Sequence, residues 1–92
     1  MINLNEYFEG AVKSLAYENN GKSTVGVIDT GEYEFGTSSP ESMYVIEGEM
    51  KVLLPASADW QLFGEGQQFE VAANSSFKVH VTKPTSYLCK YR

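Results

Sequence analysis

The feature that most constrains this chain is the spacing of its turn-forming residues. Short runs of β-branched and aromatic residues are interrupted by Gly, Pro, Asn or Ser at short intervals along nearly all of the sequence. Runs of this kind favour short β-strands joined by turns. The spacing therefore predicts an all-β sandwich or barrel with about nine or ten strands.

The expected strands can be read off the sequence in chain order. They lie in the segments GAVKSLAYE, STVGVID, TGEYEFGT, MYVIEGEMKVLL, WQLFGEG, QQFEVAA, SSFKVHVT and TSYLCKYR. The segment NNGK predicts a turn after the first strand, and MYVIEGEMKVLL predicts a hairpin that bends at Gly48. Only the opening NLNEYFEGAV has helix signals, with Asn3 or Asn5 as a cap of a turn or short helix. So many strands leave sheet edges, which closure into a barrel or a second subunit would cover.

Length and composition limit what the chain can be. Its 92 residues predict one domain spanning positions 1–92. The net charge of −5 argues against a broad interface with nucleic acid or an anionic membrane. Apolar runs stay short of the ~20 residues that a membrane-spanning helix needs. Cys89 is the sole cysteine and the start has no signal-peptide pattern, so we expect a reducing, cytoplasmic location without disulfides.

Residues 31–81 resemble a cupin, which is a double-stranded β-barrel, or jelly roll, marked by two motifs. The first motif ends in a Glu, six residues and a Gly, which Glu41 and Gly48 match. Counting from Gly66 through the second motif places its Gly at Asn74, and Asn is tolerated where a left-handed backbone is required. The resemblance implies an all-β cupin-like barrel.

The same count identifies the residues at the four metal positions of a cupin. They are Phe35, Thr37, Glu41 and Phe77. Two phenyl rings cannot bind a metal, and one carboxylate with one hydroxyl is too weak a set for a transition metal. Alternation along FKVHV turns His80 away from the face that carries Phe77. We therefore expect no metal cofactor.

Several sequence blocks resemble a more specific family. They are TVGV, GEYEF, PESM, VLLP, ADW, GQQF, NSSF and PTSYLCKY, and they resemble the small metal-free cupins of the pyrimidine/purine nucleoside phosphorylase family. The resemblance runs from about Tyr7 to Tyr91. It implies a homodimer that cleaves many purine and pyrimidine nucleosides with phosphate. The implied products are the free base and α-D-ribose 1-phosphate, without a cofactor.

Phosphorolysis of this kind sets chemical tasks that the residues can meet. Positive charge develops on the sugar in the transition state, and a carboxylate in an apolar site can stabilise it. We expect Glu41 to act there or to bind the ribose hydroxyls. Thr37 could donate a hydrogen bond to phosphate or sugar. The alternatives are that Glu41 is an exposed loop carboxylate and that Thr37 only bonds a turn.

Base and phosphate need different groups. Phe35 and Phe77 could stack on a base without reading its edge, although both could be core residues instead. Lys22, in the turn NNGKS, is the expected phosphate-binding residue. Lys78 is a second possibility, across a subunit interface. Cys89 reads as a small buried hydrophobe with no basic neighbour to activate it.

Three other functions fit the same pattern. The first is a non-catalytic module that binds a sugar or nucleotide in its cup. The second is a metal-dependent cupin enzyme, such as a dioxygenase or a sugar isomerase. The third is a structural dimer whose cavity is filled by side chains.

Overall fold

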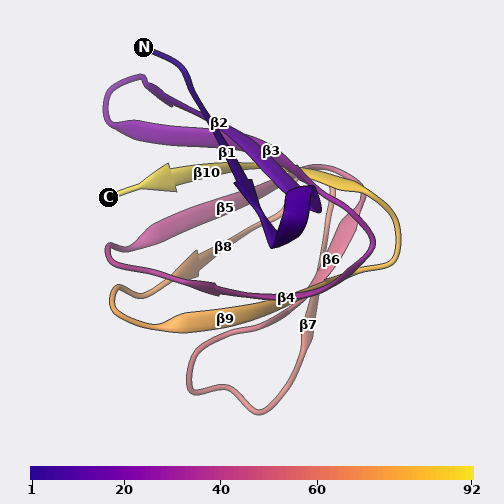
Figure 1. Cartoon of the computed structure of the whole chain (residues 1–92). Helices are drawn as coiled ribbons and strands as arrows, with labels where there is room; N and C mark the ends of the chain where they lie inside the picture. Colours follow the sequence, from indigo (N-terminus) through magenta and orange to yellow (C-terminus); the bar gives the residue numbers. More distant parts are fainter.

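The computed structural model describes all residues from 1 to 92 and consists of two antiparallel β-sheets packed face to face (Figure 1). The all-β prediction is confirmed. The first sheet contains β1 (Asn3–Tyr7), β2 (Val12–Glu18), β3 (Lys22–Ile28), β10 (Thr85–Tyr91), β5 (Glu41–Glu47) and β8 (Gln68–Val71), in that order. The second contains β4 (Gly31–Gly36), β9 (Ser76–Val81), β6 (Glu49–Leu53) and β7 (Gln61–Gly64), in that order. A single 3-10 turn, η1 (Phe8–Gly10), joins β1 to β2.

The core lies between the two sheets because alternate residues of each strand point inward. In β9, Phe77, Val79 and Val81 are buried, whereas Lys78 is exposed. Side chains from the facing sheet, such as Val12, pack into the same hydrophobic cluster. Alternation therefore fixes which residues can reach a cavity between the sheets.

Two turns that depend on a left-handed backbone are confirmed. The segment NNGK joins β2 to β3, and its Asn20 and Gly21 have φ angles of 49° and 114°. Asn74, between β8 and β9, has φ 54°. Asn is among the residues that adopt this conformation most readily, which explains its place in the cupin motif.

The predicted hairpin at Gly48 is wrong. β5 pairs with β10 and β8, while β6 pairs with β9 and β7, so the two consecutive strands belong to different sheets. Gly48 has φ 98° and turns the chain from one sheet into the other. A hairpin and a corner between layers both favour glycine, so the local sequence does not separate them.

Gly48 also lies where a side chain has no room. A Cβ atom there would lie 2.6 Å from Thr85 Oγ1, whereas at Gly21, which also has positive φ, nothing lies within 4 Å. We expect Gly48→Ala to lower the free energy of unfolding by roughly 2–4 kcal/mol, because steric overlap adds to backbone strain. Gly21→Ala should cost only about 1 kcal/mol. Denaturant titration checks both values, and equal losses would show that the contact with Thr85 is unimportant.

The predicted helix at the amino terminus is also wrong in most of its length. Residues Asn3–Tyr7 form β1, which pairs with β2 from Asn3↔Ala16 to Tyr7↔Val12. Only η1 is helical, and neither Asn3 nor Asn5 caps it, because its N-cap residue is Tyr7 without a side-chain bond. Pairing with β2 overrides the weak local helix signal. None of the structure's helices has the length and apolarity to span a bilayer.

Candidate functional site

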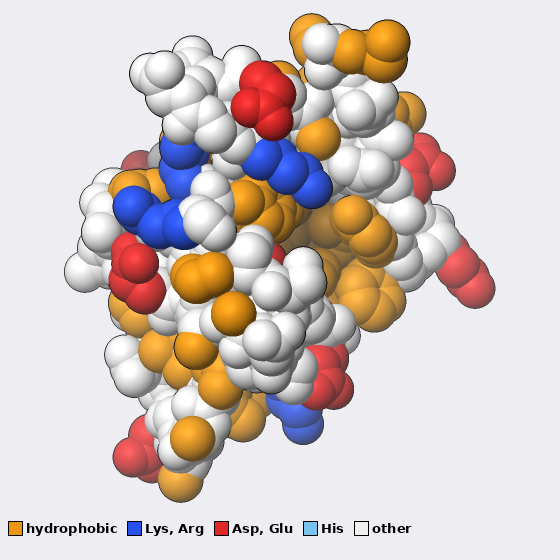
Figure 2. Space-filling view, turned by 90° about the vertical axis from the view of Figure 1, so that its left-hand side faces the viewer, with side chains coloured by type: hydrophobic (Ala, Val, Ile, Leu, Met, Phe, Trp, Pro, Cys, Tyr) orange, Lys and Arg blue, Asp and Glu red, His pale blue; other side chains and the backbone are white.

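A cavity of about 240 Å³ opens between the two sheets. Figure 2 shows it as a hollow with hydrophobic side chains on its walls and basic side chains to one side. Most of its lining is apolar, and the lining residues are Tyr7, Phe8, Ser14, Ile28, Glu34, Phe35, Gly36, Glu41, Met43, Phe77, Tyr87, Cys89 and Tyr91. The alternative of a protein whose cup is filled by side chains is therefore disfavoured.

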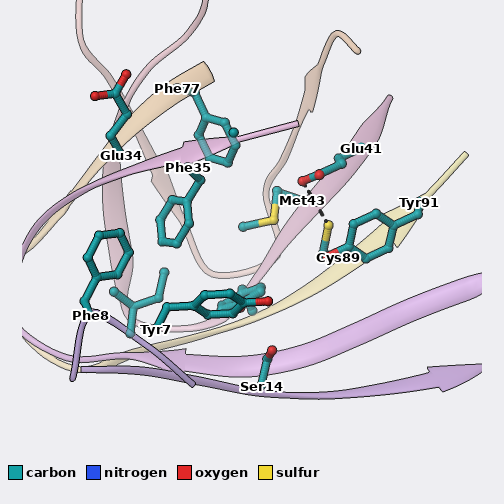
Figure 3. A pocket seen from close by; sticks show the side chains of 13 residues that line it. Tyr7, Phe8, Ser14, Glu34, Phe35, Glu41, Met43, Phe77, Cys89 and Tyr91 are labelled. Carbon is teal, nitrogen blue, oxygen red and sulfur yellow. Dashed lines mark hydrogen bonds between the residues drawn. The ribbon is translucent and has the colours of Figure 1, made fainter. Parts of the chain in front are cut away.

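One wall of the cavity is aromatic. Phe35 of β4 lies directly opposite Phe77 of β9, with 5.6 Å between ring centroids. Phe8 of η1 extends the row, with its ring 5.6 Å from that of Phe35 and nearly perpendicular to it. Figure 3 shows the three rings along the same side of the cavity. The structure thus brings Phe35 and Phe77 together in the cup, as the motif count predicts.

The opposite end of the cavity is polar and contains Glu41. Glu41 is the first residue of β5 and only 9% exposed, so the alternative of an exposed loop carboxylate is wrong. Cys89 of the neighbouring β10 donates a hydrogen bond from Sγ to Glu41 Oε1 over 3.4 Å (Figure 3). Tyr91, two residues further along β10, pairs with Glu41 in the sheet register. The carboxylate is therefore held in place by the neighbouring strand.

Burial determines the pKa shifts of the titratable side chains at the polar end of the cavity. It raises the pKa of the Glu41 carboxyl above its ordinary value of 4.5, while the Cys89 hydrogen bond and the positive charge of Lys22 lower it in part. Burial also raises the pKa of Cys89 to about 12 and that of Tyr87 to about 12, so both stay neutral at neutral pH. Cys89 is accordingly a hydrogen-bond donor and lacks the thiolate character of a nucleophile.

Glu34 also contributes to the cavity lining but has a different orientation. Its carboxylate points away from the rings in Figure 3 and accepts a hydrogen bond from Ser76 Oγ over 3.0 Å. Glu41 is therefore the carboxylate that faces Cys89 and Tyr91 at the polar end of the cavity.

Lys22 lies beside this polar end. The sheet register pairs Cys89 with Thr24, so Thr24, and Lys22 two residues before it, share the face of β3 that looks toward the cavity. Lys22 Nζ lies 4.7 Å from the centroid of the Tyr91 ring. The Tyr91 hydroxyl is in turn 3.4 Å from Thr24 Oγ1. The structure thus brings Lys22 and Glu41 to the same end of the cavity.

Thr37 is placed elsewhere. It does not line the cavity, and its Oγ1 donates to Ala72 O over 2.7 Å and accepts from Ser75 N over 3.1 Å. These bonds tie the end of β4 to the turn before β9. Lys78 and His80 alternate with the buried residues of β9 and lie on its other face. The structure therefore separates Thr37, Lys78 and His80 from the cavity.

The side chains around the cavity do not form a ligand set for a metal. No three His, Cys, Asp or Glu side chains in the chain are close enough to hold an ion. Of the four cupin metal positions, only Glu41 carries a strong ligand, and two are the phenyl rings of the aromatic wall.

Sequence reasoning missed part of the lining. Tyr87, Cys89 and Tyr91 share one face of the last strand, which alternation alone could identify. Their position beside Glu41 depends on β10 pairing with β5, and no local signal gives that pairing. Phe8 was missed because its segment has a helix-like sequence.

Comparison with known proteins agrees with this architecture. The family model described as pyrimidine/purine nucleoside phosphorylase matches residues 2–91. A protein named pyrimidine/purine nucleoside phosphorylase from Pectobacterium carotovorum is 55% identical over 93 residues, covering 99% of both chains. One of the same name from Pseudomonas savastanoi is 53% identical and covers 100% of both.

Comparison with solved structures identifies the fold class. A protein of unknown function from Vibrio parahaemolyticus superposes with a TM-score of 0.97 at 43% identity, covering 100% of this chain and 99% of its own. An RmlC-like cupin from Shewanella frigidimarina gives a TM-score of 0.78 at 18% identity, covering 98% of this chain and 82% of its own. The cupin-like fold is confirmed.

Proposed function

The chain belongs to the pyrimidine/purine nucleoside phosphorylase family, and we propose that it cleaves both purine and pyrimidine nucleosides with inorganic phosphate in the cytoplasm. The bond between the base and the anomeric carbon of ribose breaks, and a phosphate oxygen forms the new bond to that carbon. The products are the free base and α-D-ribose 1-phosphate. The observation that carries the proposal is a cavity with an aromatic wall at one end and one buried carboxyl group, that of Glu41, at the other.

The aromatic wall suits the base. Phe35 and Phe77 present ring faces and edges but no hydrogen-bonding groups, so they favour flat heterocycles without selecting one pattern of donors and acceptors. This accounts for tolerance of purines and pyrimidines together. The cavity is slightly smaller than the roughly 300–1,000 Å³ of sites that enclose a drug-sized ligand. Part of the nucleoside therefore remains at the open mouth.

Glu41 suits the sugar. Positive charge develops on the ribose ring as the base departs, and a carboxylate in a largely apolar cavity interacts with it strongly because water screens it little. The Cys89 hydrogen bond holds the carboxylate and favours its ionised form. Glu41 therefore acts as an electrostatic stabiliser of the transition state, next to the anomeric carbon.

Lys22 suits the phosphate. Its ammonium group lies over the ring of Tyr91, a lining residue of the cavity, and is close enough to Glu41 to lower the pKa of that carboxyl. In this position it can bind the phosphate dianion next to the anomeric carbon. We assign no step to a metal ion or an organic cofactor, because the side chains at the cupin metal positions do not fit a metal. Metal content below one ion per ten chains in fully active enzyme would support this assignment, and one ion per chain would contradict it.

Base release with and without phosphate tests the proposed function. Purified protein is incubated with inosine or uridine, and the free base and ribose 1-phosphate are quantified. Release that requires phosphate, with one ribose 1-phosphate per base, supports the phosphorylase. Tight nucleoside binding without turnover would instead support a non-catalytic binding module.

We also propose that the protein is a homodimer. β1 is an edge strand, and beside it the outer face of the first sheet exposes a groove lined by Leu4, Leu15, Val25 and Val27. A second copy would cover both the edge and this apolar face. Light scattering should then give twice the 10.2 kDa mass of one chain. A monomer at micromolar concentration would contradict the proposal.

A further inference from the structure

The turn that joins β1 to β2 has an unusual backbone. Phe8, Glu9 and Gly10 are consecutive residues with φ angles of 52°, 57° and 89°. Glycine adopts such angles freely, but a bulky residue such as phenylalanine at positive φ is a genuine outlier. Strain of this kind persists only where surrounding contacts impose it, and it concentrates at functional sites.

The surroundings show what the strained turn achieves. No residue of η1 is buried and no side chain caps it, so core packing does not demand this conformation. The Phe8 ring nevertheless reaches over β4, where its centroid lies 5.0 Å from that of Tyr33 and 5.6 Å from that of Phe35. The turn thus both reverses the chain between β1 and β2 and sends an aromatic ring toward the cavity.

The Phe8 ring is also left partly uncovered. It lines the cavity, yet 47% of the residue remains exposed to solvent. Its plane meets that of Phe35 at 88°, so the two rings form a corner. A flat molecule that stacks on one ring meets the edge of the other, and both contacts are favourable for aromatic systems.

We propose that Phe8 is a specificity-determining residue that contacts the base of the bound nucleoside. The inference rests on the proposed function, because the cavity then takes a nucleoside with its base toward the aromatic wall. The exposed part of the Phe8 ring is the surface that the base covers. The corner recognises a flat aromatic shape, so it serves purines and pyrimidines and favours the larger purine ring.

The experiment compares Phe8→Gly, Phe8→Ala and Phe8→Tyr with the unmodified enzyme. Glycine removes the ring and fits the left-handed backbone, so Phe8→Gly should keep the fold even if Phe8→Ala loses stability. For both, we expect KM for inosine to rise roughly 5- to 50-fold, in the range of one lost base-stacking contact. KM for phosphate should stay within about twofold, and Phe8→Tyr should restore KM for inosine. Trp60→Ala is the control, because Trp60 is 41% exposed but lies outside the cavity.

The outcomes separate this inference from the proposed function. If the unmodified enzyme turns over and Phe8→Gly has an unchanged KM for inosine, the role of Phe8 is refuted while the activity stands. If the unmodified protein does not cleave inosine, the proposed function fails, and the role of Phe8 is tested by calorimetric measurement of inosine binding without phosphate. Weaker binding by Phe8→Gly then supports the contact, and equal binding or no binding to either protein refutes it.

Discussion

Replacing Glu41→Gln is expected to lower the turnover number for phosphorolysis by roughly 100-fold or more with the fold intact. Glutamine keeps the shape of the side chain, and its amide oxygen can still accept the hydrogen bond that Cys89 donates. What disappears is the negative charge that stabilises the developing positive charge on ribose. Steady-state turnover at saturating inosine and phosphate measures the effect.

The same substitution is expected to leave the free energy of unfolding unchanged or to raise it. Burial gives Glu41 a higher pKa in the folded chain than in the unfolded chain. Such a group favours folding while it is protonated, and this contribution is lost as pH rises through the folded-state pKa. Above that folded-state pKa the ionised carboxylate therefore opposes folding, and Gln removes that cost. A carboxylate kept for structure would give the opposite result, a lower unfolding temperature in Glu41→Gln.

The pH dependence of turnover follows from the same shift. Activity should fall as pH drops through the raised pKa of Glu41, because the protonated group has no charge. The charged group that faces Glu41 is Lys22 of β3, and Cys89, Tyr87 and Tyr91 of β10 are neutral neighbours. Since the Cys89 hydrogen bond lowers the pKa of Glu41, Cys89→Ala should move the acid limb to higher pH. The residual activity of Glu41→Gln should lack that limb.

Glu34→Gln is the matched control for Glu41→Gln. Glu34 lines the same cavity, but its carboxylate points away from the rings and accepts a hydrogen bond from Ser76. The turnover number of Glu34→Gln should stay within about threefold of that of the unmodified enzyme. Equal losses in both variants would show that overall negative charge matters and that Glu41 has no special position.

The strands were predictable from the sequence because their signal is local. Turn residues such as those of NNGK and Asn74 indicate where a strand ends, and the alternation of apolar and polar residues predicts which face of the strand is buried. The pairing of strands is not local. Gly48 marks a change of direction equally well in a hairpin and in a corner between sheets, and only the pairing of β5 and β6 with strands of different sheets distinguishes the two.

The candidate site was likewise predictable where its signal is local and unpredictable where it depends on strand pairing. The motif count places Phe35, Glu41 and Phe77 in one cup because the spacing within a cupin motif sets the register of its strands. The side-chain hydrogen bond to Glu41 comes from Cys89 of β10, which is 48 residues away in the sequence and is brought alongside by sheet pairing alone. Phe8 was missed because its segment has a helix-like sequence, and because its positive φ is an outlier for a bulky residue that local preferences do not predict.

Lys22 is set apart from the other basic residues by the face of the sheet it occupies. Lys90 and Arg92 alternate with Tyr91 and bond groups on the outer face: Lys90 Nζ donates to Ser23 Oγ over 2.8 Å, and Arg92 Nε donates to Ser42 Oγ over 2.9 Å. Lys22 instead lies over the Tyr91 ring, on the face that looks toward the cavity. Its charge is therefore available to an anion beside the polar end of the cavity.

Replacing Lys22→Met is accordingly expected to lower kcat/KM for phosphate by roughly 10- to 100-fold, the range of one lost hydrogen bond to a charged group. Inosine binding measured without phosphate should stay within about twofold, because Lys22 lies at the polar end and away from the aromatic wall. Lys78→Met is the comparison, since Lys78 is exposed on the outer face of β9. If Lys78→Met loses phosphate affinity and Lys22→Met does not, phosphate binds across a subunit interface. The positive charge beside Glu41 then serves only to lower the pKa of that carboxyl, and the acid limb of the rate profile should move to higher pH in Lys22→Met.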